Sequence, residues 1–170
     1  FLIGCIKLEN LDLSGLSNVT SIPNYFLDEC SSLETVNLSG WQNVNTIGEY
    51  FLNNCSALTE LNINKWSSVT AIPNNFLNGC TSLTNLAIND WESIETIGKD
   101  FLSGCTALKT LELKNWTGVS EIPDNFLKGC ESLEDLDLSG WTGVTTINDY
   151  FLSGCEKLTN LNLSGWDGIE

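Results

Sequence analysis

The cysteines are the residues whose possible chemistry is easiest to judge from spacing. All seven recur every 25 residues, at Cys5, Cys30, Cys55, Cys80, Cys105, Cys130 and Cys155. A structural zinc site needs four converging ligands, often with histidine among them, and this chain has no histidine. Stacked units would place neighbouring thiols about 4.8 Å apart, but side chains that point the same way form disulfides only by distorting the stack. We therefore predict a column of small, buried, free thiols.

A group of three carboxylates is the second candidate for chemistry. Glu112 lies one 25-residue unit before Asp137, and Asp135 lies two residues before Asp137. Like charges on adjacent strands destabilise a sheet, and a hard cation such as calcium relieves their repulsion. Lys109 and Lys114 are near enough in sequence to give the same relief. The pattern thus permits a weak calcium site and equally a solvated acidic patch.

The chain lacks residue types on which catalysis commonly depends. The seven cations are all lysines, and histidine and arginine do not occur. No nucleophile stands beside a base, and no insertion interrupts the repeat to build a pocket. We therefore expect a protein that is not an enzyme and that uses no cofactor.

These residues occupy fixed places in a repeating unit that fills the whole chain. The units span residues 1–25, 26–50, 51–75, 76–100, 101–125, 126–150 and 151–170. A period of about 20 to 30 residues with regular leucines is typical of a solenoid, in which each unit buries its apolar face only against its neighbours. We predict a single solenoid domain over residues 1–170 that forms part of a longer array.

The strand leucines predict the face on which the units pair. Each unit carries an L-x-x-L-x-L pattern, as at Leu133, Leu136 and Leu138. The alternation around Leu136 and Leu138 has a period of two, which predicts a short strand with one inward face. Because equivalent strands of successive units run in the same direction, the predicted sheet is parallel.

The segment before each strand has a different spacing. Phe26, Leu27, Cys30 and Leu33 follow one another at intervals of one, three and three residues, which favours a short helix or 3₁₀ turns. The predicted fold is therefore an α/β repeat solenoid. It has a parallel β-sheet on one face and short helical or 3₁₀ returns on the other.

Two further columns have a regular pattern. Six units carry tryptophan at one position, namely Trp41, Trp66, Trp91, Trp116, Trp141 and Trp166. Rings at this spacing can stack and bury about 150–250 Å² each, which predicts a buried ladder, with an exposed track for carbohydrate as the alternative. Another position reads Pro23, Gly48, Pro73, Gly98, Pro123 and Asn148. This alternation indicates duplication of a 50-residue pair, and a two-unit pitch matched to a partner is the functional alternative.

The complete motif resembles a known family. The string F-L-x-G-C-x-x-L-T-x-L-x-L-S-G-W-x-x-V-T-x-I, carried by Phe126 to Ile147 and Phe151 to Trp166, is similar to BspA-like leucine-rich repeats. It also shares features with the Treponema-type repeat, whose units place a Cys before the strand leucines. The resemblance covers the whole chain. It implies a secreted or cell-surface microbial protein that binds proteins or host matrix, and the family has no catalytic residues to carry over.

The outward strand positions are where a solenoid meets its partners. The candidate ligand-binding residues are Asn37, Asn62, Asn64, Asn89, Glu112, Asp135, Asp137, Asn160 and Asn162. This face is small and polar and has no aromatic anchors, which favours a weak or repetitive interaction with a protein or a glycan.

Charge and hydropathy bound the other partners. The net charge of −15 argues against nucleic acid, which requires a dense cationic surface. There is no run of about 18 apolar residues, so no direct membrane insertion is expected. The alternative to a recognition module is a structural solenoid whose uncapped sheet edges pair end to end into a filament.

Overall fold

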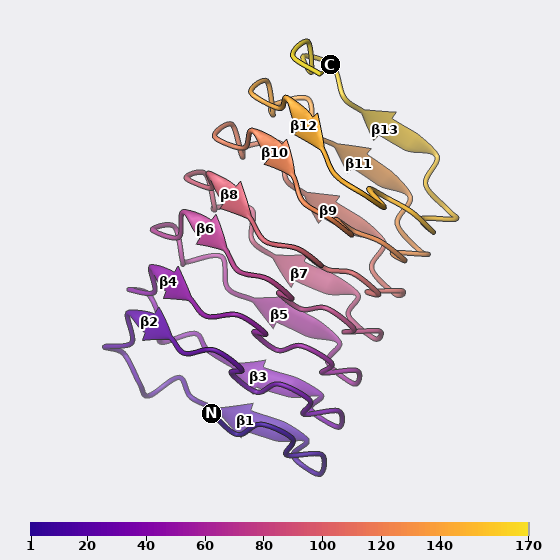
Figure 1. Ribbon diagram of the computed structural model, residues 1–170. Coiled ribbons are helices and arrows are strands. Elements are labelled where there is room, and N and C mark those ends of the chain that lie inside the picture. The colour runs from indigo at the N-terminus through magenta and orange to yellow at the C-terminus, as the bar shows by residue number, and fades with distance from the viewer. Residues whose placement is uncertain (170) are drawn as a thin grey trace.

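The computed structural model describes residues 1–169, in which the chain winds as a β-solenoid with two rows of parallel strands (Figure 1). The main row consists of β1 (Asn10–Asp12), β3 (Thr35–Asn37), β5 (Glu60–Asn62), β7 (Asn85–Ala87), β9 (Thr110–Glu112), β11 (Asp135–Asp137) and β13 (Asn160–Asn162). The second row consists of β2 (Ser21–Ile22), β4 (Thr46–Ile47), β6 (Ala71–Ile72), β8 (Thr96–Ile97), β10 (Glu121–Ile122) and β12 (Thr146–Ile147). We call each 25-residue turn of the solenoid a rung.

The register of the strands follows the sequence repeat. Leu136 lies opposite Leu111 on one side and Leu161 on the other, so each residue pairs with its equivalent one rung away. All paired strands are parallel. The predicted parallel sheet is therefore confirmed, as is the solenoid architecture.

The core is a set of stacked columns, and tryptophan is one of them. Trp91 is completely buried, its ring lies 6.2 Å from that of Trp66, and its edge meets Phe76 at 6.0 Å. Its indole Nε1 donates a hydrogen bond to the Ile63 carbonyl over 3.0 Å. Aromatic pairs of this kind add about 0.5–1.5 kcal/mol beyond the area they bury. The tryptophans thus form the buried ladder that the sequence predicts.

The predicted helical or 3₁₀ returns are wrong, since residues 1–169 contain no helix. In the return of the fourth rung, alternate residues have positive φ: Asn75 at 58°, Leu77 at 56° and Gly79 at 73°. This alternation turns successive peptide groups toward opposite neighbours. The Leu77 N–H donates to the carbonyl of Phe51 in the rung before, and the Gly79 N–H donates to the carbonyl of Ser103 in the rung after. Bonds between rungs thus replace the bonds inside a helix.

Leucine in the left-handed region carries an energetic penalty that its burial offsets. The left-handed conformation costs about 1–2 kcal/mol for a residue with a Cβ. Burying the whole Leu77 side chain, which has no exposed surface, contributes about 1.5–3 kcal/mol. The return is therefore stable only while its neighbours cover it.

Both rows of strands are interrupted at the same two places. In the described chain, β1 pairs with β3, β5 with β7, and β11 with both β9 and β13. In the second row, β2 pairs with β4, β6 with β8, and β10 with β12. In the described residues the strands of neither row pair between the second and third rungs or between the fourth and fifth. Side chains still cross these boundaries, as in the bond from Asn74 to Glu49 and the ion pair of Lys99 with Asp124. We call these two boundaries the first seam and the second seam; in Figure 1, β8 and β10 flank the second.

The prolines explain the seams of the second row. The Gly98 N–H donates to the Ile72 carbonyl over 2.8 Å and joins the fourth rung to the third. Pro73 has the equivalent position one rung earlier, has no N–H, and so cannot donate to Ile47 across the first seam. Pro123 has the same effect at the second seam. The two-unit period of the sequence is therefore a two-rung period of hydrogen bonding.

The return side continues across both seams. The Leu52 N–H donates to the Phe26 carbonyl over 2.9 Å at the first seam, and the Leu102 N–H donates to the Phe76 carbonyl over 3.1 Å at the second. The phenylalanine rings also stack across the seams, with ring centroids 5.7 Å apart at the first and 5.9 Å apart at the second. The separation of Phe126 and Phe151, where no seam lies, is also 5.9 Å. Backbone hydrogen bonds thus join every pair of neighbouring rungs along the return side. Along the two strand rows of the described chain, the strands pair only within the groups of rungs that the seams separate.

No helix in the described residues is long and apolar enough to cross a membrane.

Candidate binding face

The outward face of the main row carries the predicted asparagines, and much of their oxygen chemistry is used inside the fold. The Asn37 Oδ1 accepts a hydrogen bond from the Ser39 N–H over 3.1 Å, and the Asn62 Oδ1 accepts one from the Asn64 N–H over 3.3 Å. Such Asx turns end the strand and turn the chain. Asp137 and Asn162 make the same turn toward Ser139 and Ser164. In residues 1–169 the amide nitrogen of Asn62 makes no hydrogen bond, so this group remains available to a ligand. The pKa of Asp12 is lowered by hydrogen bonds from Ser14 and, to a lesser degree, from the Asn37 side chain.

The other candidates lie on the same face in different settings. Asn160 donates from Nδ2 to the Asp135 Oδ1, so these two side chains are tied across neighbouring strands. The Asn64 Oδ1 accepts a hydrogen bond from the Asp90 N–H over 3.1 Å. Asn89 lies exposed in the turn after β7. The predicted residues therefore share one face but do not gather into one site.

The structure does not assemble the predicted calcium ligands. Glu112 lies directly opposite Asp137, but Asp135 is two residues along β11, which is about 6.6 Å of strand rise. Within residues 1–169, no three His, Cys, Asp or Glu side chains are placed to hold a metal ion. Hydrogen bonds from Ser139, and to a lesser degree the charge of Lys114, hold the pKa of Asp137 below its ordinary value. The carboxylates of Asp135 and Asp137 are thus already bonded to protein groups, and the three residues lie as an acidic patch on the outward face.

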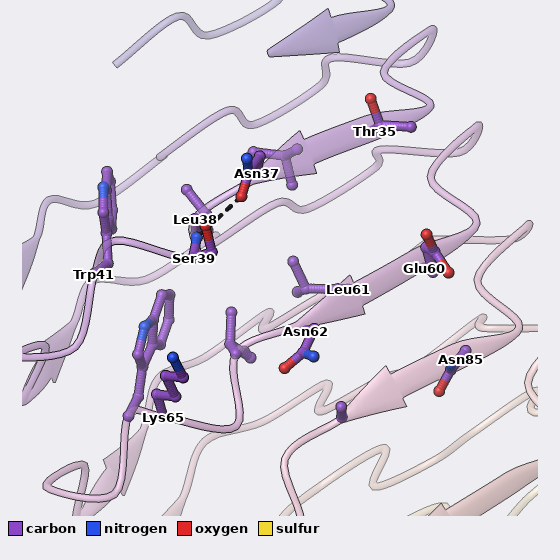
Figure 2. Close-up of a pocket in the computed structure, with 14 residues that line it drawn as sticks. Thr35, Asn37, Leu38, Ser39, Trp41, Glu60, Leu61, Asn62, Lys65 and Asn85 are labelled. Atoms are coloured by element: carbon purple, nitrogen blue, oxygen red, sulfur yellow. Dashed lines mark hydrogen bonds between the residues drawn. The ribbon is translucent and has the colours of Figure 1, made fainter. Parts of the chain in front are cut away.

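The main row is hollowed over the first seam. A cavity of about 570 Å³ extends over β3, β5 and β7, within the range of 300–1,000 Å³ usual for ligand sites. Figure 2 shows Asn37, Asn62 and Asn85 on successive strands, with Lys65 in the turn after β5. Ala87 also lines it, at the column where every other rung carries Asn, Asp or Glu. The Ala87 side chain is only a methyl group, so this column leaves more space here than at the other rungs. We call this space the seam hollow.

A second hollow of about 480 Å³ lies over β9, β11 and β13. Its lining includes five of the predicted residues, namely Glu112, Asp135, Asp137, Asn160 and Asn162. The main row thus has a hollow of mixed polarity near its first half and an acidic one near its last strands. The seam hollow also involves Thr35, Lys65 and Ala87, which the sequence analysis did not select. The only hint of it in the sequence is the alternation of proline.

The cysteines form a column of free thiols, and the predicted burial holds for five of the seven. No disulfide occurs in the described chain, and five of the seven cysteines are completely buried. The Cys80 Sγ donates to the Leu52 carbonyl of the preceding rung over 3.1 Å. Burial raises the pKa of Cys80 and of Cys130 to about 12 and raises that of Cys105 strongly. Because the thiolate is the reactive form, these thiols resist alkylation and oxidation.

The stability of the protein should fall with rising pH because of these thiols. Cys80 has a pKa of about 12 in the folded state and an ordinary value of 9.0. Between those two values the unfolded chain releases a proton that the folded chain keeps, so the stabilising effect is complete below the lower value and is lost as pH rises toward the upper one. We expect the unfolding free energy to decline less steeply over this interval in Cys80→Ala. Urea titrations at stepped pH measure the slope, and equal slopes in variant and parent would contradict the assignment.

The comparisons with known proteins agree with this architecture. A family model described as "BspA type Leucine rich repeat region (6 copies)" matches residues 2–84 and 70–166. The crystal structure of a leucine-rich repeat protein of T. pallidum (TpLRR) is similar, with a TM-score of 0.75 and 25% identity over 92% of this chain and 70% of that one.

A leucine-rich repeat protein of Bacteroides ovatus shows the same fold, with a TM-score of 0.59 and 22% identity over 86% of this chain and 41% of that one. No curated protein matches the chain. Repeats of this kind are consistent with a module for binding, and no enzymatic family is indicated. Because the family match extends over nearly all of its rungs, the chain belongs to the BspA-type leucine-rich repeat family.

Proposed function

We propose that this chain is a non-catalytic recognition and adhesion module of a secreted or cell-surface protein, and that it binds protein or glycan through the outward face of the main row. The observation that carries the proposal is the pair of hollows on that face, of about 570 and 480 Å³. The tryptophan, phenylalanine and leucine columns are largely buried in the core, so the strand side chains around the hollows are well placed to meet a partner. The exposed aromatic side chains of Tyr25 and Tyr150 lie outside both hollows.

The character of the face favours many weak contacts over one tight contact. Tight interfaces rely on Trp, Tyr or Arg anchors in desolvated pockets, and the outward strand positions are mostly Asn, Asp, Glu, Thr and Ser. Repeated sites on one rigid body gain strength by acting together on a multivalent surface. A matrix protein or a glycan coat presents such a surface.

The free thiols do not conflict with the proposed location outside the cell. An oxidising compartment endangers reactive cysteines, and the thiols of this chain are largely buried with raised pKa values. Such thiols persist without pairing. The negative net charge keeps a long body soluble there.

End-to-end stacking is the second candidate, because successive rungs carry nearly the same side chains in the same columns. The equivalent residues of neighbouring rungs lie opposite one another, as Leu11 does with Val36 and Leu136 with Leu161. The same register could continue between two copies of the chain.

The proposal is tested with two charge-matched double variants. Asn85→Lys with Thr110→Lys places one lysine in each hollow, and Thr46→Lys with Thr146→Lys places two on the second row; all four positions are exposed. We expect the first variant to lose binding to arrays of matrix proteins and glycans by at least about tenfold, and the second to keep it.

If both double variants lost binding equally, the added charge alone would explain the loss, and the main row would not be the binding face. Absence of binding to every probe by the multivalently displayed parent would refute recognition. Light scattering over a range of concentrations measures the second candidate, since rods that lengthen with concentration indicate stacking and a constant mass excludes it.

A further inference from the structure

The floor of the seam hollow contains a hydrogen-bond donor without a partner. Trp91 and Trp141 donate from Nε1 to the carbonyls of Ile63 and Leu113, over 3.0 and 2.7 Å. Trp66 lines the seam hollow and is only 1% exposed, yet its Nε1 has no acceptor in residues 1–169. The equivalent acceptor is a carbonyl on the other side of the first seam, where β3 and β5 do not pair.

A backbone hydrogen bond that other rungs make is also absent across the first seam in the described residues. The Leu13 N–H donates to the Asn37 carbonyl over 3.0 Å, and the Ile63 N–H donates to the Ala87 carbonyl over 3.2 Å. The equivalent pair across the first seam is the Leu38 N–H and the Asn62 carbonyl, which are not bonded to each other anywhere in the described structure. Both residues line the seam hollow. Unpaired polar groups that line a hollow favour a ligand or water that pairs with them.

The walls of the seam hollow add both hydrogen-bond donors and hydrogen-bond acceptors. The amides of Asn37 and Asn62 can donate, the Glu60 carboxylate accepts, and the Lys65 ammonium donates. Figure 2 shows these side chains from β3, β5 and the following turn around one space, with Leu61 at its base. A ligand that matches this set must donate and accept at many points and must also offer some apolar surface.

Sugar rings meet that requirement, because each hydroxyl both donates and accepts and the C–H faces are apolar. The net charge of −15 disfavours anionic sugars. We infer that the seam hollow is a binding site for the neutral end of a glycan, with the Trp66 Nε1 and the open backbone groups of the seam as its inner contacts. This inference rests on the proposed function and names the ligand class of its face.

The first experiment fills the hollow without disturbing the fold. Ala87→Asn introduces the residue that β3, β5 and β13 carry in the same column. The matched control is Ala71→Asn, which makes the same substitution at an exposed position of β6 in the second row, outside both hollows. The probes are lactose, maltotriose, cellotriose, mannotriose and triacetylchitotriose, titrated against the folded parent chain by calorimetry or by NMR shift. We expect Ala87→Asn to weaken binding at least about tenfold and Ala71→Asn to leave it unchanged.

The second experiment removes the unpaired donor. Trp66→Phe and Trp91→Phe each shrink a buried ring, but only Trp91→Phe also deletes an N–H that is bonded to Ile63. We expect Trp66→Phe to weaken sugar binding and to lower the thermal midpoint less than Trp91→Phe does. Trp91→Phe should lower the midpoint and leave sugar binding unchanged. A purely structural role for Trp66 would instead lower its midpoint as much as in Trp91→Phe.

The outcomes separate this inference from the proposed function. If protein probes bind to the main row and no neutral sugar does, the glycan site is refuted and the recognition face stands. If Ala87→Asn leaves sugar binding as unchanged as Ala71→Asn does, the ligand does not occupy the seam hollow and the inference is overturned. If nothing binds the face at all, both fail.

Discussion

Replacing Trp91 with alanine should lower the free energy of unfolding by about 3–5 kcal/mol, the largest effect expected of any single side chain. The Trp91 side chain has no exposed surface, stacks on Trp66 at 6.2 Å and meets Phe76 edge-on. Alanine would leave a cavity between the stacked tryptophan column and the phenylalanine column, which are both closely packed. It would also leave the Ile63 carbonyl without its indole donor. Urea unfolding followed by circular dichroism measures the loss.

Trp166→Ala is the matched control for Trp91→Ala. Trp166 is 9% exposed and stacks on Trp141 at 6.5 Å, with no later tryptophan to cover its other side. Because rungs of a solenoid contact only their neighbours, removal of this ring should unfold little beyond the last rung. If Trp166→Ala lowered the free energy of unfolding as much as Trp91→Ala, the view that each ring stabilises the fold through its two neighbouring rings would be wrong.

Gly98→Ala should destabilise the protein by about 3 kcal/mol, through overpacking and the loss of a hydrogen bond. A Cβ on Gly98 would lie 2.4 Å from the Asn74 nitrogen and 2.4 Å from the Pro73 carbonyl carbon, which are both backbone atoms. The two rungs would have to separate, and separation breaks the 2.8 Å bond from the Gly98 N–H to the Ile72 carbonyl. Unfolding in urea reports the effect.

Gly143→Ala tests whether that effect belongs to the close approach. A Cβ there would meet the Val119 carbonyl oxygen at 3.4 Å, an ordinary contact, so its effect should stay within about 0.5 kcal/mol. Comparable losses in Gly143→Ala and Gly98→Ala would contradict the view that glycine is needed for the close contact of paired rungs.

The sequence predicted the parts of the fold that repeated side chains decide by themselves. Leu136 and Leu138 alternate with polar residues, and strand periodicity follows from that alone. The burial of Trp91 follows from its size and its recurrence. The return was predicted wrongly because apolar spacing does not distinguish a helical turn from a chain whose φ alternates in sign. Leu77 normally avoids positive φ, so nothing in its identity reveals that conformation.

The binding face was predicted as a surface and not as a set of hollows. Asn37 and Asn62 were recognised as outward residues, but their Asx turns depend on backbone geometry that composition does not contain. The seam hollow arises where two strands fail to pair, which is a property of three-dimensional register. Pro73 was visible as a periodic exception, and its missing N–H is the physical link between that exception and the seam.

The hydrogen bonds that continue along the return side give this body a preferred direction of flexure. The Phe26–Leu52 and Phe76–Leu102 bonds cross the boundaries at which both strand rows are open. Bending stiffness is therefore low for deformations that spread the strand sides and high for those that stretch the return side. The first and second seams are therefore the two joints at which this body widens most easily, whereas β9, β11 and β13 hold the last three rungs together in one sheet.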